Sequence, residues 1–201
     1  MIKVFHAPRS RSLRVVWMCE EMGIAYEVEP ANLMNPSEAF LKANPARTVP
    51  VMVDGDVVIT ESIAILQYLG AKYGPTPLVV QPQEAGYAEY LEFLLLGEAS
   101  LAAHLTPMIR ARFMAPDDQK ENWTLKNNAD VFVDRLKIVE ARLGQSQYLA
   151  GDHFTAADIS VGYALGFGHA VGLGERFPEK VRDYQQRLTR RPAFQRAAAV
   201  Q

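Results

Sequence analysis

The sequence predicts an α/β domain followed by an all-helical domain. Strand and helix patterns alternate over about the first 78 residues, which is typical of a sheet covered by helices. A polar stretch from 74 to 82, rich in proline and glycine, then interrupts every regular pattern, as a linker does. Beyond it, apolar residues recur at helical spacing. We therefore expect two domains, residues 1–78 and 83–201.

Composition limits the class of protein. The 201 residues are 49% hydrophobic, enough for a sizeable core, and the formal net charge is −2. This balance gives no electrostatic reason to expect a nucleic acid or an anionic membrane as partner. No apolar run reaches the ~20 residues that span a bilayer, and the first residues read as a strand instead of a signal peptide. With a single cysteine, which excludes an internal disulfide, these features predict a cytoplasmic protein.

The first domain opens with a β–α–β pattern. We expect a strand over 2–6, a helix over 12–22 and a second strand over 25–29. In this helix the spacing places Cys19 on the buried stripe, as an inert core thiol, and Arg14 on a different stripe.

A hairpin and a further helix complete this domain. Asp54-Gly55 between two apolar runs predicts a two-residue turn, because such turns need the positive φ that Asp and Gly tolerate. Thr60 then suits the cap of a helix that carries Glu61 and Ser62 in its first turn. With a short helix before the hairpin, the expected order is βαβαββα.

The second domain contains three clear helical signals. We expect one long helix over 84–113, kinked at Pro107, and another over 117–143. Thr155 and Asp158 have the spacing of a capping box, which predicts the start of a buried helix. Four arginines near the end of the chain are expected to form a solvated helix face: Arg187, Arg190, Arg191 and Arg196.

Two segments of the first domain are suited to a small peptide. Pro50 cannot donate a ladder hydrogen bond, so the Val49 backbone is left to pair with an extended ligand. Ser62 and the amides at the helix start suit a carboxylate, and Glu61 suits an ammonium group. An ordinary helix start explains the latter residues equally well.

The order of a Val-Pro strand entry, an Asp-Gly hairpin and a Glu-Ser helix start resembles the glutathione-binding half of glutathione transferases. The Thr155 motif matches the helical domain of that family, and the segment 10–23 looks like its serine-type bacterial and fungal members. The resemblance implies a thioredoxin-like first domain, a cis Val49-Pro50 bond and glutathione as co-substrate. It also implies a homodimer with a role in detoxification.

The candidate thiolate stabiliser is Ser10, at the start of the first helix. The thiolate is the nucleophile, and a free thiol titrates near pH ~8.5, so lowering that pKa by about two units makes the anion dominant at neutral pH. Ser12 is the alternative donor and Arg11 a secondary aid, although helix capping also explains both serines. Phe5 and His6 stand where other members have a strand tyrosine.

The resemblance also assigns the remaining ligand contacts. Glutathione is expected to bind Arg47, Thr48, Val49, Pro50, Glu61 and Ser62. A hydrophobic electrophile is expected between the domains, with a candidate wall of Leu105, Met108, Arg112 and Phe113, although Leu and Met at helical spacing are more often core than ligand wall. The histidines have no metal-ligand spacing and no phosphate loop is visible, so neither a metal nor a nucleotide is expected.

Other functions fit the same residues. Glutathione-dependent isomerisation, dehalogenation and peroxide reduction are all compatible with this scaffold. A non-catalytic domain that binds protein partners is an alternative of a different class. A thioredoxin-type disulfide oxidoreductase needs Cys-x-x-Cys, and the sequence has only Cys19.

Overall fold

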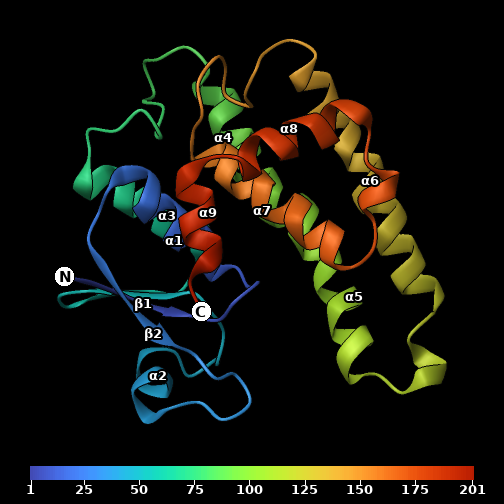
Figure 1. Cartoon of the computed structure of the whole chain (residues 1–201), viewed down its shortest axis with the longest axis horizontal. Helices are drawn as coiled ribbons and strands as arrows, with labels where there is room; N and C mark the ends of the chain where they lie inside the picture. The colour runs from blue at the N-terminus through green and yellow to red at the C-terminus, as the bar shows by residue number, and fades with distance from the viewer. The chain divides into compact units, whose positions relative to one another are not determined.

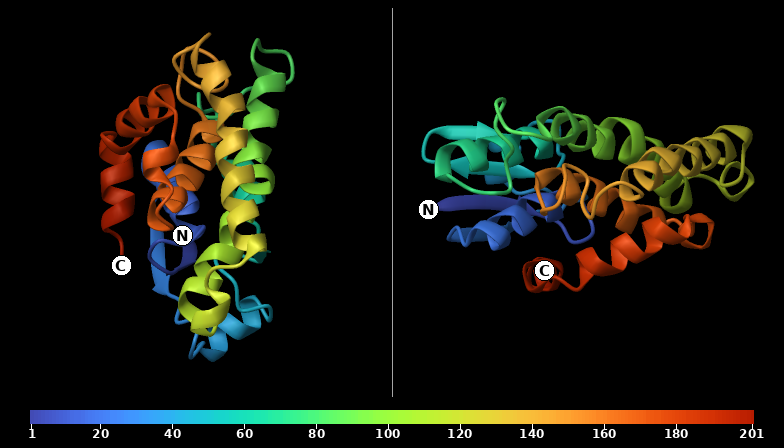
Figure 2. Two further views of the ribbon diagram at one scale, coloured as in Figure 1. Left: turned by 90° about the vertical axis from the view of Figure 1, so that its right-hand side faces the viewer. Right: turned by 90° about the horizontal axis from the view of Figure 1, so that it is seen from above.

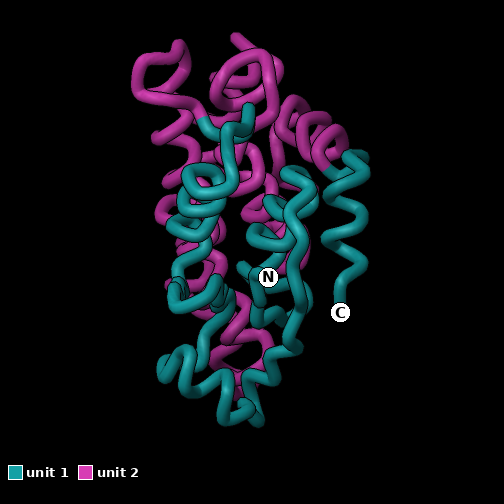
Figure 3. Tube along the Cα trace, turned by 90° about the vertical axis from the view of Figure 1, so that its left-hand side faces the viewer, with its two compact units in different colours: residues 1–79, 189–201 teal, residues 80–188 magenta.

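The computed structural model describes all 201 residues, which form two compact units. Unit 1 contains residues 1–79 and 189–201, and unit 2 contains residues 80–188 (Figure 3). The first division falls in the expected linker. The sequence did not indicate that 189–201 pack with the N-terminal segment, because those residues are separated from it by the whole of unit 2.

Unit 1 is built on a four-stranded sheet with the order β2-β1-β3-β4. β1 pairs parallel with β2 and antiparallel with β3, and β3 pairs antiparallel with β4. The expected βαβαββα order is confirmed. The elements are β1 (Ile2–His6), α1 (Ser12–Met22), β2 (Tyr26–Pro30), α2 (Glu38–Ala43), β3 (Val51–Asp54), β4 (Val57–Ile59), α3 (Ser62–Tyr73) and, at the other end of the chain, α9 (Pro192–Ala199).

Helices cover both faces of this sheet. Figure 1 shows α2 on one side and α1 with α3 on the other. Phe5 of β1 packs on the α2 side against Phe40, with ring centroids 5.5 Å apart, and against Val51. Because side chains alternate along a strand, Val4 and His6 point to the opposite face, where both are buried.

The hairpin turn is displaced by one residue from its expected position. Asp54 pairs with Val57, so the two central turn residues are Gly55 and Asp56. Gly55 has φ +61°, a value that glycine adopts without steric strain. Cross-strand pairing therefore selected Gly55-Asp56 over Asp54-Gly55.

Asp54 instead ends β3 and anchors it to α3. Its Oδ2 atom accepts hydrogen bonds from Tyr68 Oη at 2.9 Å, Lys72 Nζ at 2.7 Å and Tyr73 Oη at 2.8 Å. The Lys72 ammonium holds the pKa of Asp54 below its usual range, with help from the two phenols. One carboxylate thus ties the hairpin to the last two turns of α3.

The buried side of α1 is wider than its apolar stripe. Cys19 is fully buried, and burial raises the pKa of its thiol to about 12, as fits an inert core residue. Arg14, which the spacing puts on a different stripe, is fully buried as well. Its Nη1 atom donates to Ser62 Oγ at 3.2 Å, so the charged side chain joins α1 to the start of α3.

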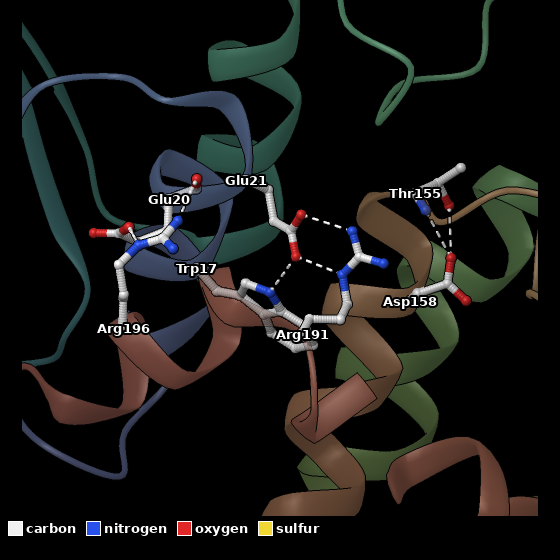
Figure 4. Close-up of polar contacts among 7 residues, drawn as sticks. All are labelled: Trp17, Glu20, Glu21, Thr155, Asp158, Arg191 and Arg196. Carbon is white, nitrogen blue, oxygen red and sulfur yellow. Dashed lines mark hydrogen bonds and ion pairs between the residues drawn. The ribbon is translucent and has the colours of Figure 1, made fainter. Parts of the chain in front are cut away.

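The expected solvated arginine face is wrong for Arg191, whose side chain is 28% exposed, whereas Arg196 stays 57% exposed within its ion pair. Arg191 forms a bidentate pair with Glu21, at 2.6 Å to Oε1 and 2.8 Å to Oε2, and Trp17 Nε1 donates to the same carboxylate at 2.9 Å. Arg196 pairs with Glu20 at 2.5 Å. Figure 4 shows both pairs between α1 and the C-terminal segment. The acidic partners lie at the other end of the sequence, so spacing within the last helices did not reveal them.

Removing the larger pair should weaken unit 1. We expect Arg191→Ala to lower the free energy of unfolding by about 1–3 kcal/mol, because Glu21, whose side chain is 9% exposed, loses its charged partner. Denaturation followed by tryptophan fluorescence measures this loss. Arg190→Ala, at an exposed neighbouring position, is the matched control and should change stability little. Equal losses in the two variants would contradict the prediction.

Unit 2 is all helical. Its segments are α4 (Tyr87–Leu95), the π-helical η1 (Leu96–Ala102), α5 (Ala103–Met114), η2 (Asp117–Gln119), α6 (Trp123–Leu143), α7 (Ala156–Ala170), η3 (Gly174–Arg176) and α8 (Glu179–Thr189). Figure 2 shows α5 and α6 side by side. No helix is long and apolar enough to cross a membrane.

The long helix expected over 84–113 is present, but its irregularity is not at Pro107. Winding changes over η1, and Pro107 lies inside α5. Close packing accompanies η1: a Cβ on Gly97 would lie 2.4 Å from Ser160 Oγ of α7. Ser160 Oγ also donates to the Leu94 carbonyl at 2.7 Å, directly before η1. Contact with α7 thus coincides with the change in winding, as is typical of π-helical insertions.

The two other helical signals of unit 2 are confirmed, apart from one boundary. α6 ends at Leu143, as expected, and buries its apolar stripe from Leu125 to Val139. It begins at Trp123 and not at 117, because Asn122 caps it by accepting from the Leu125 amide. α7 begins with the capping box: the Thr155 hydroxyl accepts from the Ala157 amide, and the Asp158 carboxylate accepts from the Thr155 amide, a contact drawn in Figure 4.

Candidate active site

The Ser10 loop joins β1 to α1. Arg9 has φ +62°, which is uncommon outside glycine, and α1 begins at Ser12 after Arg11, whose side chain makes no capping hydrogen bond. Ser10 is half-buried. Its Oγ donates to the Ala7 carbonyl at 2.7 Å and accepts from the Ser12 amide at 3.3 Å. Ser10 therefore satisfies one helix-terminal amide and still presents a hydroxyl at the N-terminus of α1.

Ser12 and His6 lie beneath this hydroxyl. Ser12 is fully buried, with its Oγ 2.7 Å from Ser10 Oγ and 2.8 Å from His6 Nδ1. His6, the last residue of β1, is 1% exposed. Burial lowers the pKa of His6, and the backbone of Val200 offsets this only in part, so the neutral imidazole is favoured. We call these three hydrogen-bonded side chains, His6, Ser12 and Ser10, the His6 network; only Ser10 is partly exposed.

No motif in the sequence marked His6 as a site residue; it stands only where other members of the family have a strand tyrosine. One signal was present: alternation along β1 places His6 on the face that α1 covers, directly before the serine loop.

The loop before β3 has the expected geometry at its proline. The Val49-Pro50 peptide bond is cis, as the resemblance implied. Arg47 and Thr48 are exposed, and Arg47 has φ +57°. Buried Asn44, another residue that sequence reasoning missed, holds this loop by donating from Nδ2 to the carbonyl and the hydroxyl of Thr48, each at 2.9 Å.

The start of α3 differs from the expectation by one residue. Its N-cap is Glu61 and not Thr60, because the backbone of Glu61, two residues after the end of β4, is still extended, with φ −95° and ψ 119°. Glu61 is exposed and makes no capping hydrogen bond with its side chain. The Ser62 side chain is turned inward to accept from Arg14, so its hydroxyl is occupied by the protein. The first-turn amides of α3 have no partner within their own helix.

The topology of unit 1 brings these segments together. Phe5 of β1 is in register with Val51 of β3, so the chain leaving β1 toward Ser10 and the chain entering β3 from Val49 lie at the same end of the sheet. The Arg14–Ser62 bond joins α1 to the start of α3. This end of the sheet combines a hydroxyl, an extended backbone and two helix N-termini, a combination suited to a small anionic peptide.

The four candidates for the electrophile wall, all in unit 2, have different environments. Leu105 is fully buried and belongs to the core, whereas Phe113 is 75% exposed. Met108 and Arg112 line a cavity of about 450 Å³ within unit 2. Its other lining residues are Lys120, Glu121, Leu125, Lys126, Ala129 and Val171. No group of three or more His, Cys, Asp or Glu side chains in the structure is placed to hold a metal ion.

Comparison with known proteins identifies the family. The model of the glutathione S-transferase N-terminal domain matches residues 9–72, and that of the C-terminal domain matches residues 124–196. Glutathione S-transferase 1 of Triticum aestivum is 30% identical over 213 residues, which cover 97% of this chain and 92% of that protein. The chain belongs to the glutathione S-transferase family.

Solved structures agree with this assignment. The glutathione transferase of Methylococcus capsulatus matches with a TM-score of 0.86 and 25% identity, covering 98% of this transferase and 97% of that chain. A glutathione S-transferase I bound to lactoylglutathione matches with a TM-score of 0.80 and 26% identity, covering 98% of both chains. The expected fold, a thioredoxin-like α/β domain with an all-helical domain, is confirmed.

Proposed function

We propose that this transferase uses the Ser10 hydroxyl to hold bound glutathione as its thiolate, which then attacks an electrophilic carbon of a small molecule. The observation that carries the proposal is the half-buried Ser10 hydroxyl at the N-terminus of α1, at the same end of the sheet as the cis Val49-Pro50 bond. Ser12 is fully buried, which favours Ser10 over Ser12 as the group that touches the ligand.

The Ser10 hydroxyl can turn toward a thiolate at little expense to the loop. It now donates to the Ala7 carbonyl, which also accepts from the Ser10 amide at 3.2 Å and has Ser12 Oγ at 3.3 Å. That carbonyl therefore keeps partners when Ser10 turns away. A hydrogen bond to a charged group contributes about 1.5–3 kcal/mol, which corresponds to roughly one to two pKa units of the glutathione thiol. The N-terminus of α1 adds to the stabilisation of the anion.

The other contacts of glutathione follow from the same end of the sheet. The Val49 backbone pairs with the extended peptide, and the first-turn amides at Ser62 bind the γ-glutamyl carboxylate while Glu61 accepts from its ammonium group. Arg47 and Thr48, both exposed, are the candidates for the glycyl carboxylate. Lactoylglutathione in the similar glutathione S-transferase I supports a glutathione-derived ligand. The proposal involves no metal and no nucleotide.

A thiolate titration tests this function. Protein saturated with glutathione is titrated by ultraviolet difference absorbance, against protein saturated with S-methylglutathione, which has no thiol. We expect the bound thiol to titrate about two pH units below the ~8.5 of a free thiol. A folded protein that binds no glutathione, or binds it with an unshifted thiol, would instead favour the protein-interaction domain.

We also propose a cytoplasmic role in detoxification, with a hydrophobic electrophile as the second substrate. Met108 and Arg112 are our candidates for contact with it, because they line an accessible cavity. Leu105 is buried, so a direct contact there would require unit 2 to open. Isomerisation, dehalogenation and peroxide reduction use the same thiolate and are separated by screening one substrate of each class.

A homodimer is the final part of the proposal. Three large apolar side chains of unit 2, Phe113, Met114 and Trp123, are 67–75% exposed, which supports a second copy as their cover. Light scattering at micromolar protein should give twice the 22.4 kDa of one chain. If light scattering gives the mass of one chain at micromolar protein concentrations, the protein is a monomer.

A further inference from the structure

We infer that His6 and Ser12 are positioning residues that orient the Ser10 hydroxyl toward its ligand, an inference that rests on the proposed role of Ser10. The observation behind it is the His6 network. Its two contacts, 2.8 Å from His6 Nδ1 to Ser12 Oγ and 2.7 Å from Ser12 Oγ to Ser10 Oγ, are those of good hydrogen bonds.

Each tautomer of neutral His6 favours a different arrangement of the protons along the network. With the proton of neutral His6 on Nδ1, His6 donates to Ser12, Ser12 donates to Ser10, and the Ser10 proton points out of the network. With the proton on Nε2, the Ser12 proton goes to His6 and the Ser10 proton is drawn inward to Ser12. In the first arrangement Ser12 does not compete for the Ser10 proton, whereas in the second a thiolate must draw that proton away from Ser12.

The surroundings of His6 favour the first arrangement. Its Nε2 atom is buried and makes no hydrogen bond in the structure, whereas Nδ1 has Ser12 at 2.8 Å. A buried N–H that makes no hydrogen bond is destabilising and rare in folded proteins, which favours Nδ1 as the site of the proton. The Val200 backbone raises the pKa of His6, and burial outweighs this effect. Burial keeps the ring neutral, with a single proton to place.

Two substitutions of His6 separate this role from packing. In His6→Asn the side-chain amide reaches the position of Nδ1 and can still donate to Ser12. In His6→Gln the amide reaches the position of Nε2 and leaves Ser12 without its donor. We expect the thiol pKa of bound glutathione to stay at the wild-type value in His6→Asn. In His6→Gln and Ser12→Ala we expect this thiol pKa to rise by about one unit. At a pH well below the pKa, that rise is a tenfold loss of thiolate.

Affinity distinguishes a positioning role from a damaged site. The Kd for glutathione, measured by calorimetry at pH 5.5, should change less than twofold in all three variants, because the thiol is protonated there and Ser10 itself remains. His153→Gln, at an exposed histidine, is the control and should match the wild type. Circular dichroism and thermal melts verify folding.

Each outcome decides the inference. Wild-type thiol pKa values in His6→Gln and Ser12→Ala, with a raised value in Ser10→Ala, would refute the network's role and leave the proposed function intact. An unshifted thiol in the wild-type protein would refute the proposed function itself. Nitrogen-15 NMR of the histidine rings measures which ring nitrogen of neutral His6 carries the proton, and it needs neither glutathione nor a variant that might misfold. A proton on Nδ1 supports the inference, and a proton on Nε2 overturns it.

Discussion

Ser10→Ala is expected to lower kcat/KM for glutathione conjugation by about 10- to 100-fold at pH 7, with the Kd for glutathione within a few-fold of wild type. Without the hydroxyl, the thiol pKa returns toward ~8.5, so only a few per cent of the bound glutathione is thiolate at neutral pH. Losses of this size are common when one hydrogen-bond donor to a developing anion is removed. Initial rates with an aromatic halide as electrophile measure the effect.

The loss of activity in Ser10→Ala should depend on pH. Near pH 9 the thiolate forms without help, so most of the activity lost in Ser10→Ala should return. Ser37→Ala is a matched serine control: Ser37 accepts from the Phe40 amide at the N-cap of α2, and its removal should lower stability by about 1 kcal/mol without lowering activity. An equal fractional loss at pH 7 and pH 9 would rule out thiolate stabilisation as the role of Ser10.

The largest loss of stability is expected from Asp158→Ala. Asp158 is fully buried and accepts four hydrogen bonds: Oδ2 from the Thr155 amide at 2.8 Å and the Thr155 hydroxyl at 3.2 Å, and Oδ1 from the Leu149 amide at 3.0 Å and Tyr184 Oη at 2.7 Å. Burial raises the pKa of Asp158, and these donors oppose that shift. Truncation leaves them buried without an acceptor, so we expect a loss of about 3–5 kcal/mol in the free energy of unfolding.

Urea denaturation followed by circular dichroism measures this loss. Asp152→Ala, at an exposed aspartate of the same loop, should change stability by less than about 0.5 kcal/mol. Thr155→Ala leaves the Asp158 carboxylate in place but removes the capping hydroxyl and the buried γ-methyl group, and should lose about 1–2 kcal/mol. If Asp158→Ala lost no more than Thr155→Ala, the carboxylate would be a helix cap alone and not the link between α7, Leu149 and Tyr184.

Most of the elements could be predicted because their signals are local. The apolar stripe of α6, the glycine at the end of α1 and the capping box of α7 each act within a few residues of chain. The error of one residue at Asp54 occurs where strand pairing sets the turn, and the error at Thr60 occurs where the backbone is still extended at Glu61, after β4 has ended. The kink expected at Pro107 was also misplaced because of a contact between elements: the change in winding occurs at η1, where Gly97 packs against α7.

The sequence by itself determined the family, the fold and the candidate residues Ser10 and Val49, because these depend on residue type and on spacing along the chain. Only the tertiary structure decided which side chains support them. His6 beneath Ser12, Arg14 against Ser62 and Arg191 on Glu21 are contacts between separate elements. Such contacts depend on how strands and helices pack in space, and a pattern within one segment carries no information about the element that packs against it.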